Sequence, residues 1–191
     1  MSATIAMSAF ADCAEVAATR PSAVARPLGP LSIVSVTAWS GADPALSGSV
    51  QAAFGLTLPQ AGRWTQAGDI AALWVGPGHW WLQRERASAL FAELEPVVGG
   101  HAALIDISDA RAVLRVSGAA APTILASLLP IDLHPRAFRP GQVASTVAAH
   151  IGVQIRQLDD APTYDLSCLR SFAGSLWRSV ELAGAGRIRL G

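Results

Sequence analysis

The spacing of hydrophobic residues along the chain predicts short strands that alternate with short helices. Apolar runs with β-branched residues indicate strands over residues 31–38, 70–75 and 103–107, and residues 79–83 form a hairpin with the second of these. Helices are expected over 43–54, with Asp43 as cap and Gly55 as stop, and over 86–95. The first half therefore has the order β-α-β-β-α-β.

The second half repeats this kind of order. Strands are predicted over 112–116, 142–150, 151–158 and 163–169, and helices over 120–129 and from the cap Ser171 to residue 183. The pattern predicts an α+β protein of two similar halves, 31–108 and 109–191, with antiparallel sheets and helices on one face. Residues 1–30 are rich in Ala, Ser, Pro and Arg, so we expect a flexible N-terminal extension there.

Composition narrows the function classes. The formal net charge is zero and no basic stripe is visible, so nucleic acid is not an expected partner. No apolar run reaches the roughly 18 residues of a membrane span, so no membrane partner is expected either. All basic residues are arginine, which excludes lysine chemistry such as Schiff bases. Cys13 and Cys168 are too few for a disulfide framework, and we expect free thiols and a cytoplasmic location.

The candidate chemistry of single residues is weak. The four histidines, His79, His101, His134 and His150, are far apart and have no metal-ligand spacing, so no metal site is expected. Ser108 has no nucleophile-elbow motif around it, and its segment is interpreted as a turn. No dinucleotide fingerprint is present. We therefore expect neither catalytic nor cofactor-binding residues in this chain.

Aromatic and arginine residues provide the remaining signal. Six tryptophans stand against one tyrosine, and the adjacent Trp80 and Trp81 must face opposite sides of a strand. The loop from Ile131 to Gly141 holds His134, Arg136 and Phe138 between prolines. Since exposed Trp and Arg are typical interface anchors, we interpret these five side chains as a partner interface. The alternatives are that the tryptophans are core residues and that Phe138 packs under its own loop.

Four segments, taken in order, resemble the gamma subunit of heterotetrameric sarcosine oxidase. They are LWVGPGHWWL (73–82), DISDARAVLRVSG (106–118), IDLHPRAF (131–138) and LRSFAGSLW (169–177). The resemblance implies a fold similar to the folate-binding domain of glycine-cleavage aminomethyltransferase. It covers about residues 70 to 183 and leaves the first 30 residues outside.

The resemblance also implies a role in a complex. That complex oxidises sarcosine to glycine, releases the one-carbon unit as formaldehyde or passes it to tetrahydrofolate, and forms hydrogen peroxide. The partners implied are the alpha, beta and delta subunits, chiefly alpha, which hold FAD, FMN, NAD, zinc and tetrahydrofolate. The gamma subunit is then a structural component without catalytic residues. A related secondary-amine oxidase would look the same from this subunit.

A stand-alone folate-binding or aminomethyltransferase-like domain is the alternative. It would need a carboxylate aimed at the pterin ring and an arginine for the glutamate tail. Asp106 or Asp109 with Arg111 or Arg115 are the candidates for these roles.

Overall fold

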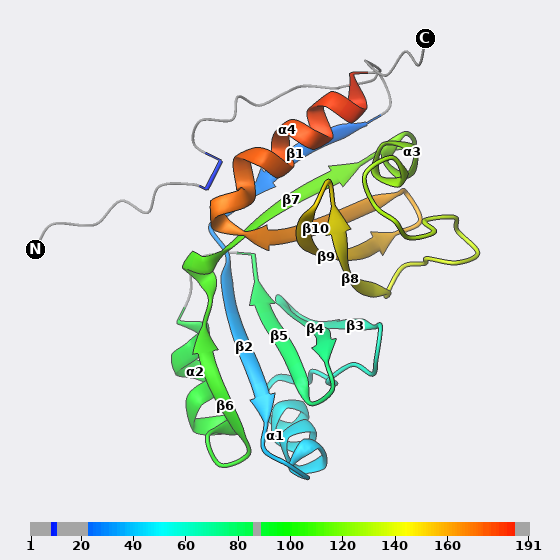
Figure 1. Ribbon diagram of the computed structural model, residues 1–191. Helices are drawn as coiled ribbons and strands as arrows, with labels where there is room; N and C mark the ends of the chain where they lie inside the picture. Colours follow the sequence, from blue (N-terminus) through cyan, green and yellow to red (C-terminus); the bar gives the residue numbers. More distant parts are fainter. Residues whose placement is uncertain (1–8, 11–22, 86–88, 186–191) are drawn as a thin grey trace, which may run out of the picture.

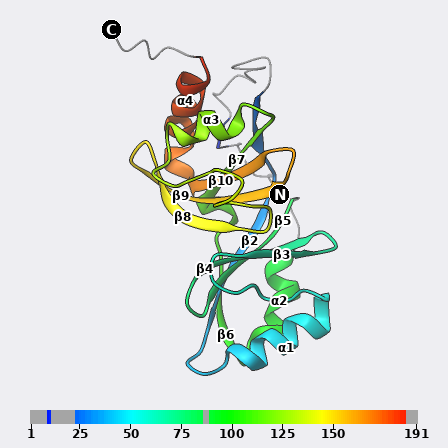
Figure 2. The same cartoon turned by 90° about the vertical axis from the view of Figure 1, so that its right-hand side faces the viewer.

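The computed structural model describes residues 9–10, 23–85 and 89–185. Two five-stranded sheets, in which every described strand pair is antiparallel, lie against each other, and the helices lie on their outer sides (Figure 1, Figure 2). This arrangement confirms the predicted α+β class and the antiparallel sheets.

The first half contains one sheet and two helices. Its strand order is β3-β4-β5-β2-β6. The elements are β2 (Ser32–Ala38), α1 (Asp43–Phe54), β3 (Trp64–Ala67), β4 (Ile70–Gly76), β5 (His79–Arg84), α2 (Leu90–Val98) and β6 (Ala102–Asp106). The helix predicted from residue 86 thus begins later, and residues 86–88 lie outside the described ranges.

The second half has the strand order β1-β7-β10-β9-β8. Its elements are β1 (Val24–Leu28), the short 3-10 helix η1 (Ser108–Ala110), β7 (Arg111–Ser117), α3 (Ala121–Ala126), β8 (Val143–Ala148), β9 (Ile151–Asp159), β10 (Thr163–Leu169), η2 (Arg170–Phe172) and α4 (Ala173–Gly184). The figures place α3 and α4 at the end of the molecule opposite to α1 and α2 (Figure 2).

Strand β1 corrects the expectation of a flexible extension for residues 24–28, whereas residues 1–8 and 11–22 of that segment lie outside the described residues. It pairs with β7 from Val24↔Ser117 to Leu28↔Val113, so a strand that precedes the whole first sheet in the sequence belongs to the second sheet (Figure 1). Ala23 and Ala25 face the core of the second half, and Pro27 is tolerated because β1 is an edge strand. Phe10, also in the predicted extension, is buried beside Trp177.

The helix caps differ from the prediction as well. The residue that caps α1 is Ala42, and Asp43 lies in the first turn; α4 is preceded by η2, with Phe172 rather than Ser171 at its cap. Neither cap residue makes a side-chain hydrogen bond. Pro44 at the start of α1 and Gly55 at its end (φ 64°) are as expected, because the left-handed stop favours glycine.

Each sheet has an outer face against its helices and an inner face toward the other half. Val34, Val36, Trp80 and Leu82 pack with α1 and α2, whereas Leu114, Ile155, Tyr164 and Leu166 pack with α3 and α4. The alternate residues of the same strands face inward. The inner faces of the two sheets meet between the halves, and we call this region the seam.

Candidate functional site

Apolar side chains hold the middle of the seam. Ile33, Trp81 and Val113 form one cluster between β2, β5 and β7. Ala71, Leu73 and Val143 form a second between β4 and β8, with Trp64 and Trp74 packed against it. Both clusters contain residues of both halves, so burial of apolar surface joins the two sheets.

Hydrogen bonds also cross the seam. The Gln154 Nε2 atom donates to the Trp74 carbonyl at 2.9 Å, and the Trp64 indole N–H donates to the Gln157 carbonyl at 2.8 Å. Backbone bonds join Val143 N to the Gly62 carbonyl and Trp64 N to the Gly141 carbonyl, each at 3.0 Å. These directed bonds fix the relative position of the halves, which apolar contact alone does not do.

A buried charge network lies beside these bonds. Asp165 on β10 accepts from Arg115 Nε at 2.7 Å and from Arg156 Nη2 at 2.8 Å, and it is only 3 % exposed. The hydrogen bond to Asp165 raises the pKa of Arg115. Arg156 also lies 4.8 Å from the centre of the Trp64 ring, and the Gln83 carboxamide faces it. The network thus pairs one carboxylate with two guanidinium groups.

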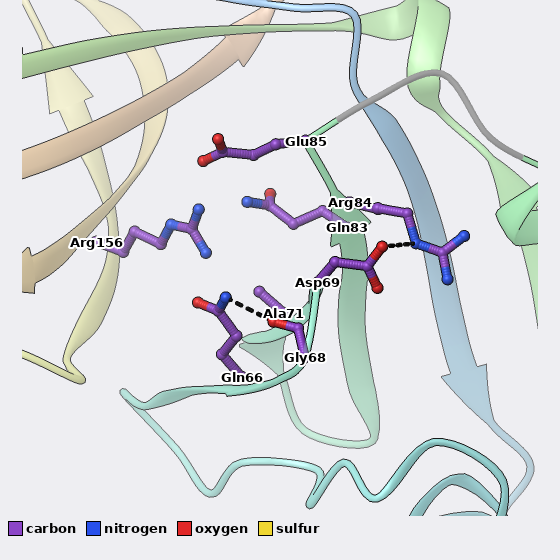
Figure 3. A pocket seen from close by; sticks show the side chains of 8 residues that line it. All are labelled: Gln66, Gly68, Asp69, Ala71, Gln83, Arg84, Glu85 and Arg156. Atoms are coloured by element: carbon purple, nitrogen blue, oxygen red, sulfur yellow. Dashed lines mark hydrogen bonds and ion pairs between the residues drawn. The ribbon is translucent and has the colours of Figure 1, made fainter.

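One hollow of about 400 Å³ opens next to this network, and we call it the charged hollow (Figure 3). Glu85, Gln83 and Arg156 point into it, whereas Arg84 turns away toward Asp69. Glu85 pairs with Arg115, and Arg84 pairs with Asp69 and with Glu93 at 3.0 Å. Its charged groups are therefore occupied by ion pairs within the chain, so the charged hollow is best explained as part of the structure that joins the halves.

A second hollow of about 390 Å³, the Arg111 groove, has a different lining. Its walls come from β4, β5, β7, β8, β9, β10 and η2. They are formed by Val75, His79, Trp81, Arg111, Ser145, Thr146, Gly152, Val153, Gln154, Leu169 and Phe172. The guanidinium carbon of Arg111 lies 4.3 Å from the centre of the Trp81 ring.

Arg111 has no anionic partner among the described residues. Its Nε atom is buried without a hydrogen bond, and burial lowers the pKa of its guanidinium. Neighbouring groups do not supply a negative charge: burial raises the pKa of the Cys168 thiol to about 11, which leaves it neutral. His79, whose Nε2 lies 2.7 Å from Ser35 Oγ, has a pKa lowered by burial and by Arg111. The groove therefore combines an uncompensated cation with apolar walls.

The histidines and Ser108 are the candidates for metal binding and nucleophilic chemistry. No group of three His, Cys, Asp or Glu side chains within residues 9–10, 23–85 and 89–185 is placed to hold a metal ion. Ser108 N donates to Asp106 Oδ1 at 2.9 Å and begins the short 3-10 helix η1, which confirms the turn interpretation of this segment. The Ser108 hydroxyl accepts from Ile33 N at 2.9 Å and so joins this turn to β2. No described helix is both long and apolar enough to cross a membrane.

Residues 39–186 match the family described as sarcosine oxidase, gamma subunit family. The chain belongs to this family. The sarcosine oxidase gamma subunit of Arthrobacter sp is 36% identical over 126 residues, which cover 62% of this chain and 60% of that protein. The gamma subunit of Corynebacterium sp. (strain U-96) is 37% identical over 109 residues, or 55% of this chain and 53% of that one. The matches thus span less than two thirds of these relatives.

Solved structures extend this family likeness. A chain of the heterotetrameric sarcosine oxidase from Corynebacterium sp. U-96, in complex with pyrrole 2-carboxylate, has a TM-score of 0.81 at 28% identity, covering 93% of this chain and 94% of that chain. Aminomethyltransferase T of the glycine cleavage system from Bartonella henselae has a TM-score of 0.64 at 15% identity, covering 85% of this chain and 46% of that chain. The latter likeness concerns the fold alone and confirms the predicted fold class.

The structure places the five side chains predicted as an interface in this gamma-subunit family member in two environments, buried and exposed. Trp80 and Trp81 face opposite sides of β5 as expected, yet each is only 7 % exposed; the Trp80 N–H donates to the Pro59 carbonyl, and Trp81 lies in the seam. Phe138 is equally buried, in the core of the second half. Their burial shows that these three side chains pack within the chain itself, and their role in a partner interface stays a prediction.

His134 and Arg136 are exposed, and their interface role stays a prediction. The loop is held by its own bonds: His134 N donates to Asp132 Oδ1 at 2.8 Å and Arg136 N to His134 Nδ1 at 3.2 Å. It is thus ordered, as its prolines indicate.

The residues considered for folate do not form one site. Asp106 is bound by Ser108, Asp109 lies on η1, and Arg115 is held by Asp165 and Glu85. Arg111 is the exception, because it lines a groove and is unpaired. The sequence could name Arg111 as a candidate binding residue at the start of β7. That no acidic side chain pairs with it in space follows only from the fold.

Proposed function

We propose that the chain is a structural, non-catalytic subunit of a heterotetrameric sarcosine oxidase. The observation that carries this proposal is the likeness of nearly the whole chain to one chain of the Corynebacterium heterotetramer, with a TM-score of 0.81 over 93% of its length. Family membership supports it independently. Arg115, Arg156, Asp165 and Glu85 are also engaged with one another at the seam, which suits a component that has to keep a fixed shape.

In this proposal the complex oxidises sarcosine to glycine in the cytoplasm. The one-carbon unit leaves as formaldehyde or passes to tetrahydrofolate, and hydrogen peroxide forms. FAD, FMN, NAD, zinc and tetrahydrofolate belong to the alpha, beta and delta subunits, and this chain binds none of them. Its main contact is the alpha subunit.

Co-expression with the other sarcosine oxidase subunits of the same organism tests this function. An affinity tag on this chain is expected to recover a complex of four subunits that forms peroxide with sarcosine as substrate. Omitting this chain should lower the yield or stability of the complex, while its flavin content per assembled complex stays the same. A tagged chain that recovers no partner, or an oxidase that assembles and works equally without it, would contradict the proposal. Parallel assays with other secondary amines would identify a related oxidase.

The alternative, a stand-alone folate-binding domain, is tested by titrating the isolated full chain with tetrahydrofolate. We expect no saturable heat signal, because Arg115 and Asp106 already have partners within the chain. Saturable binding that is lost in Arg115→Gln would favour the alternative.

The loop of residues 131–141 gives a test that separates binding from folding. Arg136 is exposed and its fork of donors suits a carboxylate of a partner, so Arg136→Ala should weaken association with the other subunits by about 1–3 kcal/mol and leave unfolding unchanged. Phe138→Ala should instead destabilise the chain by about 3–5 kcal/mol, because it removes a buried ring. Equal association of wild type and Arg136→Ala would remove this loop from the interface.

A further inference from the structure

We propose that the Arg111 groove receives an acidic side chain of a partner subunit, and that apolar residues of the same partner segment cover Leu169 and Phe172. The inference rests on the proposed function as an oxidase subunit and assigns part of its docking surface. No motif of the sequence identifies this groove, since its lining comes from seven elements of both halves.

The charge of the groove is the first argument. Arg111 is a partly desolvated cation, and no described carboxylate pairs with it, whereas Arg84, Arg115 and Arg156 all have carboxylate partners. A guanidinium removed from water without an anion costs free energy, and a carboxylate that arrives with a partner would recover it. Trp81 holds the guanidinium plane in position, so little conformational freedom is lost on binding.

The walls of the groove are the second argument. Leu169 ends β10, Phe172 ends η2, and each is 45 % exposed. Large apolar side chains that border an unpaired cation are typical of protein interfaces, where apolar contacts surround a charged pair and exclude water. Val75 and Val153 extend the apolar lining into the groove.

These features favour a protein segment over a small anion. A free carboxylate or phosphate would satisfy Arg111, but it would leave Leu169 and Phe172 in water. The further polar groups of the lining are also largely used within the chain: Gln154 bonds the Trp74 carbonyl and Ser145, and His79 bonds Ser35. One cation beside two exposed apolar side chains matches one acidic residue in an apolar stretch of polypeptide.

The test measures affinity between the full-length chain and its co-purified oxidase subunits. Arg111→Met keeps the apolar stem over Trp81 and removes the charge; we expect a loss of affinity of at least about tenfold. Arg111→Lys keeps a cation without the planar fork and should lose less. Phe172→Ser should weaken binding by about three- to tenfold.

Arg178→Met serves as the matched control, because Arg178 is exposed on α4 and lines neither hollow. Its affinity should equal that of wild type. Thermal unfolding of each chain provides a second readout: Arg111→Met is expected to unfold at the wild-type temperature or above, since it removes an uncompensated charge. A residue whose role was to stabilise the monomer would show the opposite.

The outcomes distinguish the two levels of the proposal. If the wild-type chain binds no oxidase subunit, the proposed function fails; if wild type binds and Arg111→Met binds equally well, only the docking inference is overturned. Should Arg111→Met not fold, undiminished binding by both Arg111→Lys and Phe172→Ser overturns it. Two further measurements would identify another occupant of the groove. If affinity for the oxidase subunits does not depend on Arg111, Arg111-dependent acetate binding in calorimetry would assign the groove to a small anion. Arg111-dependent self-association in sedimentation would then assign it to a second copy of the chain.

Discussion

At the residue scale, local signals were predictable and long-range pairings were not. The sequence correctly indicated that Ser108 sits in a turn and that Trp80 and Trp81 face opposite sides of a strand. It did not indicate that Asp165 pairs with Arg115, because the two residues are 50 positions apart. A polar residue within an apolar strand indicates that another polar residue pairs with it inside the protein, but only the fold identifies that residue.

Replacing Asp165 tests the buried charge network. Asp165→Asn would leave the guanidinium groups of Arg115 and Arg156 without their shared carboxylate, and Arg156 is only 3 % exposed. We expect the free energy of unfolding to fall by about 3–5 kcal/mol in urea titrations. The control Asp160→Asn, at an exposed hairpin turn, should change it by less than about 0.5 kcal/mol. Equal effects would show that the network contributes little.

The buried thiol of Cys168 provides a pH prediction. Burial raises its pKa to about 11, whereas an unfolded thiol ionises near about 8.5. Above the pKa of the unfolded thiol, the unfolded chain is stabilised by loss of the thiol proton, whereas the folded chain keeps this proton. Folding stability should therefore fall as pH rises from about 9 to about 11. In a Cys13→Ser background, urea midpoints across this range should fall less for Cys168→Ala. Rapid modification of Cys168 by a thiol reagent in the native chain at pH 8 would contradict its burial.

At the element scale, strands with strong apolar runs were predictable and weak ones were not. β2, β4, β5, β7, β9 and β10 lie where the pattern placed them. β1 and β3 were missed, because β1 contains a proline and β3 has only four residues. The turn between β8 and β9 was missed, because the predicted strand over 142–150 continued directly into the next strand. Ala149 and His150 take positive φ values of 46° and 71° there, which neither residue type signals.

A pair of substitutions in β1 tests whether this N-terminal strand belongs to the fold. Ala25 faces the core, and Arg26 faces solvent on the same strand. Ala25→Asp should destabilise the chain by about 2–4 kcal/mol, because it buries a carboxylate without a partner. Arg26→Asp introduces the same group on the outer side and should change stability by less than about 1 kcal/mol. If both variants unfold like wild type, β1 does not contribute to the stability of the second sheet.

At the scale of the whole molecule, the duplicated architecture was predictable from the order of elements, but the seam was not. The sequence pattern identifies which residues of a strand lie on the face away from the helices. It does not indicate how the two sheets pack against each other. Trp64 illustrates this: it lies in a missed strand, yet it bonds the Gln157 carbonyl, stacks with Arg156 and packs on the cluster around Leu73. The unpaired state of Arg111 could not be predicted from the sequence either, because the residues around its side chain come from both halves.

The seam predicts that the two halves unfold as one cooperative unit. If Trp64 couples them, Trp64→Ala should lower the free energy of opening by about 2–4 kcal/mol in both halves, including amides of β2 and β10 that do not contact the ring. Native-state hydrogen exchange with mass spectrometry measures both regions in one experiment. Trp39→Ala removes the same ring from a site that is 54 % exposed and should leave both values near wild type. A loss of protection confined to the first half would mean that the sheets are independent units, and that the Arg111 groove between them is not a fixed surface on which a partner can dock.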